Sequence, residues 1–133
     1  MYLIDTNIFS EARRRTREAA RWIRQADPDA CFLSVITLGE IVKGIALKER
    51  QDPTAAQGLN RWLDHLRIDY ASRILPVTDA VATEWGRLVA LRPRPTADAL
   101  IAATAITHRL SLVTRNVADF ADVGVPVINP FAR

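Results

Sequence analysis

The sequence predicts an α/β fold, a three-layer α/β/α sandwich in which helices cover both faces of a mostly parallel, twisted sheet of four to five strands. Two observations lead to this prediction. Short apolar runs alternate along the chain with longer segments whose apolar residues recur at helical spacing. One of those longer segments, residues 97–109, is apolar nearly all round, so it should be buried against the sheet.

The first elements are expected at the N-terminus of the chain. The run Tyr-Leu-Ile-Asp at residues 2–5 predicts a buried strand that leads into a helix near Asn7. Residues 16–26 predict a helix, because alanines, a tryptophan and an isoleucine are interleaved with arginines. Residues 31–35 are mostly small and apolar and predict a second buried strand.

The middle of the chain predicts two amphipathic helices followed by a strand. In the first helix the apolar residues recur at i, i+3, i+4 and i+7, as Leu38, Ile41, Val42 and Ile45. Asp52 and Pro53 end that helix, and residues 54–70 repeat the same kind of pattern. Residues 74–77 predict a short third strand.

The C-terminal part of the chain predicts two helices, two strands and a short turn. The apolar residues of the first helix are Val81, Trp85, Leu88 and Val89, and it should stop before the prolines at 93 and 95. Thr96 is the expected N-cap of the helix over 97–109. Strands are predicted at 111–114 and 125–128, with a short helical turn at 117–122 between them.

The bulk properties favour one domain, residues 1–133, in a reducing compartment. A chain of 133 residues can build a core without staples. The single cysteine, Cys31, cannot form an internal disulfide and is expected to be a small buried hydrophobic residue. No signal peptide or run of the ~20 apolar residues needed to span a membrane is visible, so the expected location is cytoplasmic. No dinucleotide-binding or Walker motif occurs among the five glycines.

Four acidic residues are the candidate functional groups, although each also has an ordinary structural explanation. Asp5 ends the first strand and could simply cap the next helix. Glu40 and Asp98 lie in predicted first helical turns, where the helix dipole favours a negative charge. Asp119 follows the fourth strand and could be a turn former, as could Asn116.

The combination of the four acids is harder to explain by structure alone. Asp5, Glu40 and Asp119 come soon after predicted strands, and Asp98 opens a helix that packs on the same sheet. Sites in such sheets lie at the carboxyl ends of the strands, so the four could converge there. Carboxylates that lie close together raise one another's pKa unless a cation binds between them. Mg²⁺ and Mn²⁺ prefer oxygen ligands and could supply that charge. Such a centre suits phosphodiester hydrolysis.

Four segments in order along almost the whole chain resemble the PIN-domain family, in particular the VapC- and FitB-like toxin ribonucleases of type II toxin–antitoxin systems. They are residues 2–7 (YLIDTN), 34–41 (SVITLGEI), 95–102 (PTADALIA) and 112–120 (LVTRNVADF). The resemblance implies a PIN-like sandwich, a Mg²⁺ site that also accepts Mn²⁺, and endoribonuclease activity on tRNA, rRNA or mRNA. It further implies a VapB- or FitA-like antitoxin that blocks the site, a homodimer and larger toxin–antitoxin assemblies.

The resemblance also assigns roles by position. It implies that Asp5, Glu40 and Asp98 are metal ligands and that Asp119 is the fourth catalytic acid. Some relatives carry an acid where this chain has Asn116, so either Asn116 or Asp119 could complete the site, with one metal ion or two. Thr6 and Thr114 are expected to support these side chains.

An arginine cluster and the remaining aromatic residues are less decisive. The cluster, Arg13, Arg14, Arg15 and Arg17, could grip phosphate or an acidic part of an antitoxin, or be a solvated helix face. The sixteen arginines against two lysines fit nucleic-acid binding, although the net charge of +3 decides little. The three tryptophans are expected to pack in the core, with one possible interface residue among them.

Other classes of protein fit the sequence less well. A phosphoacceptor receiver module would need a lysine near the last strands, and residues 114–116 supply none. A phosphatase of the haloacid-dehalogenase kind would need a second acid two residues after Asp5, where the chain has Asn7. A non-catalytic PIN module that binds RNA or protein remains the alternative.

Overall fold

The computed structural model describes residues 1–14 and 16–131 and confirms the predicted α/β architecture. Its five strands form one sheet in the order β3-β2-β1-β4-β5, and each pair of neighbours is parallel. The strands are β1 (Tyr2–Ile4), β2 (Cys31–Ser34), β3 (Ile74–Leu75), β4 (Ser111–Val113) and β5 (Val127–Ile128).

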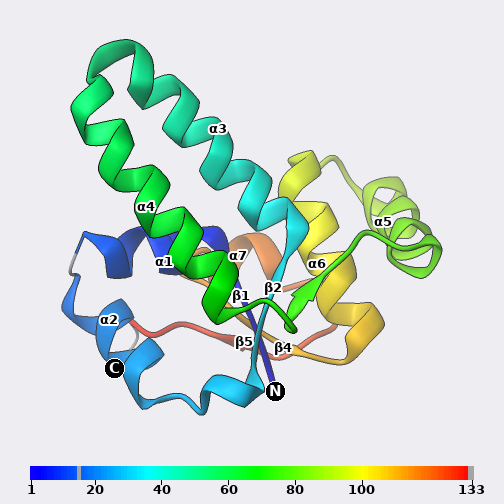
Figure 1. Ribbon diagram of the computed structural model, residues 1–133. Helices are drawn as coiled ribbons and strands as arrows, with labels where there is room; N and C mark the ends of the chain where they lie inside the picture. The colour runs from blue at the N-terminus through cyan, green and yellow to red at the C-terminus, as the bar shows by residue number, and fades with distance from the viewer. Residues whose placement is uncertain (15, 132–133) are drawn as a thin grey trace.

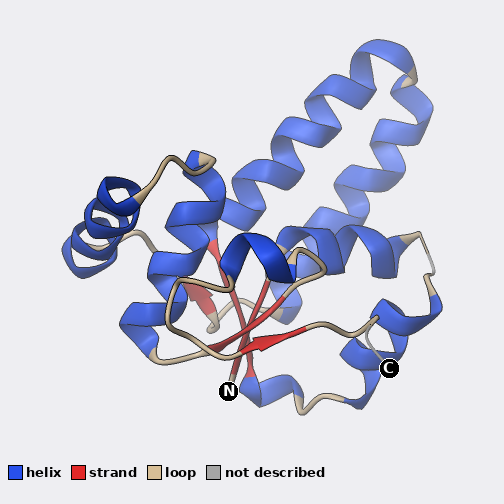
Figure 2. Ribbon diagram, turned by 180° about the vertical axis from the view of Figure 1, so that it is seen from behind, coloured by secondary structure: helices blue, strands red, loops and turns tan. Residues whose placement is uncertain are grey.

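Seven α-helices are present in the described part of the chain, and they cover both faces of the sheet (Figures 1 and 2). They are α1 (Thr6–Arg13), α2 (Arg17–Gln25), α3 (Val35–Gln51), α4 (Pro53–Asp69), α5 (Asp79–Leu91), α6 (Thr96–His108) and α7 (Val117–Phe120), and a 3-10 turn, η1 (Pro28–Ala30), precedes β2. None of them is both long and apolar enough to cross a membrane.

Two hydrophobic clusters make up the core, one on each face of the sheet, because successive strand residues point to opposite sides. In β1, Ile4 contributes to the cluster formed with α1, α2, α3 and α4, while Leu3 contributes to the cluster with α5, α6 and α7. In β4, Val113 and Leu112 divide in the same way. The central strands are therefore buried on both faces, as a three-layer sandwich requires.

The strands are shorter than the sequence predicts, for identifiable reasons. Asp5 and Val35 fall outside their strands because the chain turns at once into a helix: Asp5 caps α1, and Ser34 caps α3 by accepting a hydrogen bond from the Ile36 amide. The third strand ends at Leu75, before Pro76, which has no amide hydrogen to pair.

Helix α3 departs from the prediction on one face. It forms a hairpin with α4 that projects beyond the sheet (Figure 1), so that only part of its surface is covered. Ile41 and Ile45 are buried as predicted, but Val42 is 43% exposed. The buried face of this helix is thus narrower than the spacing of its apolar residues predicted.

Candidate active site

The strand order places a topological switch point between β1 and β4. From there the chain builds outward in opposite directions, to β2 and β3 on one side and to β5 on the other. In open α/β sheets such a reversal opens a crevice at the carboxyl ends of the strands. Asp5 follows β1 and Thr114 follows β4, so these two residues stand at the crevice.

Asp5 is buried at this point, with only 4% of its surface exposed, and both of its carboxylate oxygens accept hydrogen bonds. Oδ1 accepts a hydrogen bond from the Thr6 amide at 2.8 Å, which caps α1. Oδ2 accepts from the Thr114 hydroxyl at 2.8 Å and from the Asn7 side-chain amide at 3.2 Å. Asp5 is therefore both the structural cap and a rigidly held carboxylate at the switch point.

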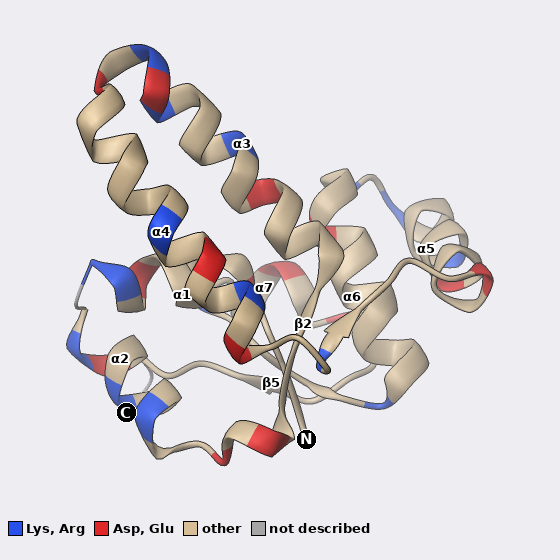
Figure 3. Cartoon of the chain, viewed as in Figure 1, with Lys and Arg blue, Asp and Glu red and all other residues tan. Residues whose placement is uncertain are grey.

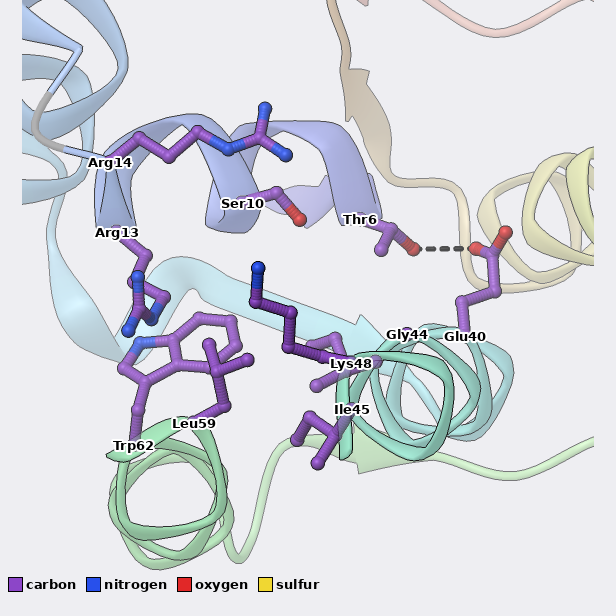
Figure 4. A pocket seen from close by; sticks show the side chains of 11 residues that line it. Thr6, Ser10, Arg13, Arg14, Glu40, Gly44, Ile45, Lys48, Leu59 and Trp62 are labelled. Carbon is purple, nitrogen blue, oxygen red and sulfur yellow. Dashed lines mark hydrogen bonds between the residues drawn. The ribbon is translucent and has the colours of Figure 1, made fainter. Parts of the chain in front are cut away.

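Glu40 reaches the same crevice from the second turn of α3. The Thr6 hydroxyl donates to Glu40 Oε1 at 2.6 Å (Figure 4). It also lies 3.2 Å from the Thr37 hydroxyl. Thr6 thus contacts Glu40 through its side chain and Asp5 through its backbone amide. One residue at the start of α1 fixes two of the predicted acids.

Asp98 lies in the first turn of α6, as predicted, but the predicted cap is wrong. The N-cap is Pro95, and Thr96 is the first helical residue with no capping hydrogen bond from its side chain. The Ala99 amide donates to the Pro95 carbonyl at 3.0 Å, so the helical hydrogen bonds already begin at Pro95, one residue earlier than predicted. In Figure 3, acidic segments appear on α3, α6 and α7 around the strand ends.

Asp5, Glu40 and Asp98 share one open pocket of about 320 Å³, which confirms that they converge. The pocket is completed by polar and charged residues, namely Thr6, Asn7, Ser10, Glu11, Arg14 and Asn116. Within the described residues, no three acidic, histidine or cysteine side chains stand close enough together to chelate one ion directly. The acids line a common space and leave room for water between them.

The proximity of the acids is visible in their proton affinities. The pKa of Asp5 is raised to about 6, mainly by burial, while the hydrogen bonds from Thr114 and Thr6 lower it and the charges of Asp98 and Glu40 add to the rise. Burial also raises the pKa of Asp98, followed by repulsion from Glu40 and Asp119. Two other carboxylates therefore repel the charge of Asp98, namely Glu40 in the pocket and Asp119 outside it.

Asp119 does not line the shared pocket. It is exposed on α7 and lines a neighbouring hollow together with Asp98, so Asp98 is the residue common to both spaces. Asn116 lines the shared pocket, and its backbone amide donates to the Thr114 hydroxyl at 3.1 Å. Of the two candidates for completing the site, Asn116 is in the pocket with Asp5 and Asp119 is next to Asp98.

An ion-pair network, here called the arginine clamp, holds the segment after α7 against the start of α6. It consists of Arg92, Arg94 and Asp122. Arg94 donates two hydrogen bonds of 2.9 Å to the Asp122 carboxylate and one to the Leu88 carbonyl, and its side chain is only 3% exposed. Arg92 donates to Asp122 and to the backbone carbonyl of Asp119. The clamp therefore fixes the backbone that carries Asp119.

The predicted arginine cluster is divided by the structure. Arg14 lines the shared pocket and, with Arg13, an adjoining groove. Arg17 is exposed on α2 and lines neither the shared pocket, nor the adjoining groove, nor the hollow beside Asp119, and Arg15 lies outside the described residues. The part of the cluster on α1 faces the site.

Sequence reasoning missed several residues at the site. Ser10 and Glu11 line the shared pocket, and neither was singled out from the sequence. Asn7 joins the ends of β1 and β4: its side chain contacts Asp5 and Thr114, and it accepts a hydrogen bond from the Arg115 amide. Its position two residues after an aspartate at a strand end was a usable signal. Lys48 lines the adjoining groove and has no local signal, because it comes from a distant turn of α3.

The donor set fits a hard divalent cation. Asp5 is held by neutral hydroxyl and amide groups, and no cationic side chain forms a salt bridge with Asp5, Glu40 or Asp98 in the described residues. Mg²⁺ usually binds through one or two carboxylates and keeps several waters. An open pocket lined by separated carboxylates suits this mode of binding, because it leaves space for the waters that the ion keeps.

Comparison with known proteins agrees with this architecture. The family model for the PIN domain matches residues 2–126. The chain is similar to the plasmid stability protein StbB of Pseudomonas syringae pv. tomato, with 34% identity over 98% of this chain and 99% of that protein. It is also similar to the VapC ribonuclease Y4jK of Sinorhizobium fredii, with 30% identity over 98% of each.

Two solved structures show the same fold at 30% identity. FitAcB from Neisseria gonorrhoeae superimposes with a TM-score of 0.89, and the match covers 100% of both chains. A toxin–antitoxin complex from Klebsiella pneumoniae superimposes with a TM-score of 0.74, again over 100% of both chains.

Proposed function

This chain belongs to the PIN-domain family, and on that basis we propose that it is a metal-dependent endoribonuclease, the toxin of a type II toxin–antitoxin system. One observation carries the proposal. Asp5, Glu40 and Asp98 come from three separate elements and line one pocket at the switch point of the sheet. The relative named as a VapC ribonuclease and the toxin–antitoxin complex with this fold support the substrate and the biological role.

Mg²⁺ is the proposed cofactor, and Mn²⁺ is expected to substitute for it. Asp5, Glu40 and Asp98 would hold the ion, in part through waters in the pocket. When bound, a divalent cation there would stabilise negative charge on the attacked phosphate and increase the acidity of water. It would also relieve the repulsion that raises the pKa values of Asp5 and Asp98.

The chain's own residues position these acids and the water. Thr6 and Thr114 fix the carboxylates of Glu40 and Asp5 by donated hydrogen bonds. Asp119, which faces Asp98, is proposed to orient the attacking water with help from Asn116. Hydrolysis then leaves a 5′-phosphate and a 3′-hydroxyl on RNA, with tRNA, rRNA or mRNA as the substrate.

The proposed partners follow from the same role. An antitoxin of the VapB or FitA kind would block the pocket, and the toxin would form a homodimer and larger assemblies with it. Arg13, Arg14, Arg15 and Arg17 are the proposed contacts for RNA or antitoxin. Because the substrate is RNA, the cytoplasm is the proposed compartment, and the whole chain is proposed to act as one domain.

Cleavage of defined RNA pools by purified protein tests the function. We expect cleavage of tRNA, rRNA or mRNA with Mg²⁺ or Mn²⁺, and complete loss on chelation. Asp98→Asn should abolish cleavage, whereas Asp64→Asn, which neutralises an exposed carboxylate on α4, should leave it unchanged. Metal-independent cleavage, or full activity of Asp98→Asn, would show that the assignment is wrong.

A further inference from the structure

A groove of about 390 Å³ runs beside the acidic pocket, between α1, α3 and α4. Figure 4 shows the side chains that line it. Ile45, Leu59 and Trp62 form an apolar floor, the Arg13 guanidinium lies over Trp62, and the Lys48 ammonium points into the space toward α1, while Arg14 ends near Ser10 at the opposite rim (Figure 4).

The groove is continuous with the acidic pocket. Thr6, Ser10, Arg14 and Glu40 line both spaces. A polymer whose scissile bond lies among the acids would therefore pass directly into the groove on one side. The occupant of the groove must therefore be able to extend into the acidic pocket.

The chemistry of the groove matches a nucleotide. An indole offers a flat face on which any base can stack, and cations on a backbone-tracking groove neutralise phosphates. Trp62 is only partly buried, and the Arg13 guanidinium lies 6.0 Å from the centre of its ring. Since Arg13 is exposed, it can turn from the ring to a phosphate when a base takes its place.

We propose that this groove is a binding subsite for one nucleotide of single-stranded RNA next to the scissile phosphate. The base stacks on Trp62, and Arg14 and Lys48 contact the adjoining phosphates. The proposal rests on the proposed ribonuclease function and deepens it, because it assigns the strand a path out of the acidic pocket.

A peptide would find few main-chain partners in this groove. The walls are helices, whose backbone groups are paired internally, so an extended peptide finds no strand edge to join.

Binding of short labelled RNAs, followed by fluorescence anisotropy in EDTA so that nothing is cleaved, tests the subsite. Two probes of equal length and charge are used, a six-residue oligouridylate and the same ribose–phosphate chain without bases. Trp62→Leu should weaken binding of the first by about 5- to 150-fold, the range for one stacked base, and leave the second unchanged.

Lys48→Ala should weaken binding of both probes equally and reduce the steepness of the salt dependence by about 0.7, as expected for one lost phosphate contact. Lys48 is exposed, so this variant should fold even if Trp62→Leu does not. Trp22→Leu, which removes an indole packed edge-on against Tyr2, and Lys43→Ala, on another part of α3, are the matched controls and should leave both affinities unchanged.

The outcomes separate the subsite from the proposed function. If the wild-type protein cleaves RNA with metal but Trp62→Leu and Lys48→Ala bind both probes as the wild type does, the subsite is wrong and the nuclease stands. Equal losses of both probes in Trp62→Leu, or no binding by the wild type, also overturn it. Loss of antitoxin binding alone in these variants would identify a protein site instead.

Discussion

Asp5 and Asp122 are both fixed by several hydrogen bonds, but their partners are of opposite kinds. Asp5 is 4% exposed and is surrounded by hydroxyl and amide donors, and its burial raises its pKa to about 6. The side chain of Asp122 is 47% exposed, and hydrogen bonds from Arg92 and Arg94 hold its pKa well below its usual range. Both aspartates accept several hydrogen bonds, but of the two only Asp122 has cationic partners among the residues that the structure describes.

The difference separates a structural acid from a proposed metal ligand. The charge of Asp122 is balanced by the fold, so the arginine clamp needs nothing from outside. The charge of Asp5 is positioned by neutral groups and left uncompensated, which favours a cation supplied from solution. If this comparison is correct, changes on the Asp5 side should affect activity most and changes on the Asp122 side should affect mainly stability.

The largest expected effect comes from Asp5→Asn. Loss of the carboxylate should lower cleavage by more than about 100-fold, beyond the effect usual for a group that only orients a metal ligand. Because a neutral amide is cheaper to bury, the variant should be as stable as the wild type or up to about 3 kcal/mol more stable in metal-free buffer at pH 7. Denaturant unfolding and RNA cleavage measure the two effects, and a clear loss of stability would contradict the comparison.

Thr114→Val should have the next largest effect, because it removes the donor to Asp5 Oδ2 and the acceptor of the Asn116 amide. We expect activity to fall about 10- to 100-fold and stability to fall by about 1–3 kcal/mol. Thr114→Ser keeps the hydroxyl and should restore most of both. Equal activity of the valine and serine variants would show that Thr114 does not position Asp5.

The pH dependence of stability sharpens the same comparison. Unfolded aspartate ionises near pH 3.8 and folded Asp5 near 6, so between these values the folded chain retains a proton that the unfolded chain has lost. The stability of the metal-free protein should therefore decrease as pH rises through that window, and Asp98 contributes with the same sign. Protons and the metal ion compete for Asp5, so with subsaturating Mg²⁺ cleavage should fall as the pH drops below about 6.

Thermal unfolding from pH 4 to 7, without metal and with saturating Mg²⁺, measures this effect. The decrease should shrink in Asp5→Asn and when Mg²⁺ is present. If Tm changes with pH in the same way in the metal-free wild type and in Asp5→Asn, the charge of Asp5 does not destabilise the folded protein.

The smallest effect on activity is expected from the arginine clamp. Arg94→Met removes two hydrogen bonds to Asp122 and one to the Leu88 carbonyl, from a side chain that is almost fully buried. We expect a lower Tm but less than a tenfold loss of activity at a temperature where the variant is folded, about the lower limit for a supporting residue. Arg87→Met, which breaks an exposed i,i+3 pair with Glu84, is the control and should change neither. A loss of activity as large as that of Asp5→Asn would break the comparison.

Much of this fold was predictable because its signals are local. Helical spacing and buried runs identified every helix and strand of the α/β pattern, including the nearly all-apolar α6. Strand ends were less accurate, because Asp5 and Ser34 act as helix caps at residues where apolar character alone continues the strand. Val42 shows the same limit, because a stripe of apolar residues does not reveal how much of it the neighbouring elements cover.

The sequence by itself determined the alternation of strands and helices and the presence of four acids next to element ends, because both depend on neighbours along the chain. Only the tertiary structure decided that Asp5, Glu40 and Asp98 share a pocket while Asp119 lies beside it, and that Lys48 and Trp62 meet Arg13 in one groove. Those relations depend on the strand order and on the direction in which α3 and α4 leave the sheet. Long-range packing sets both, and no single segment encodes it.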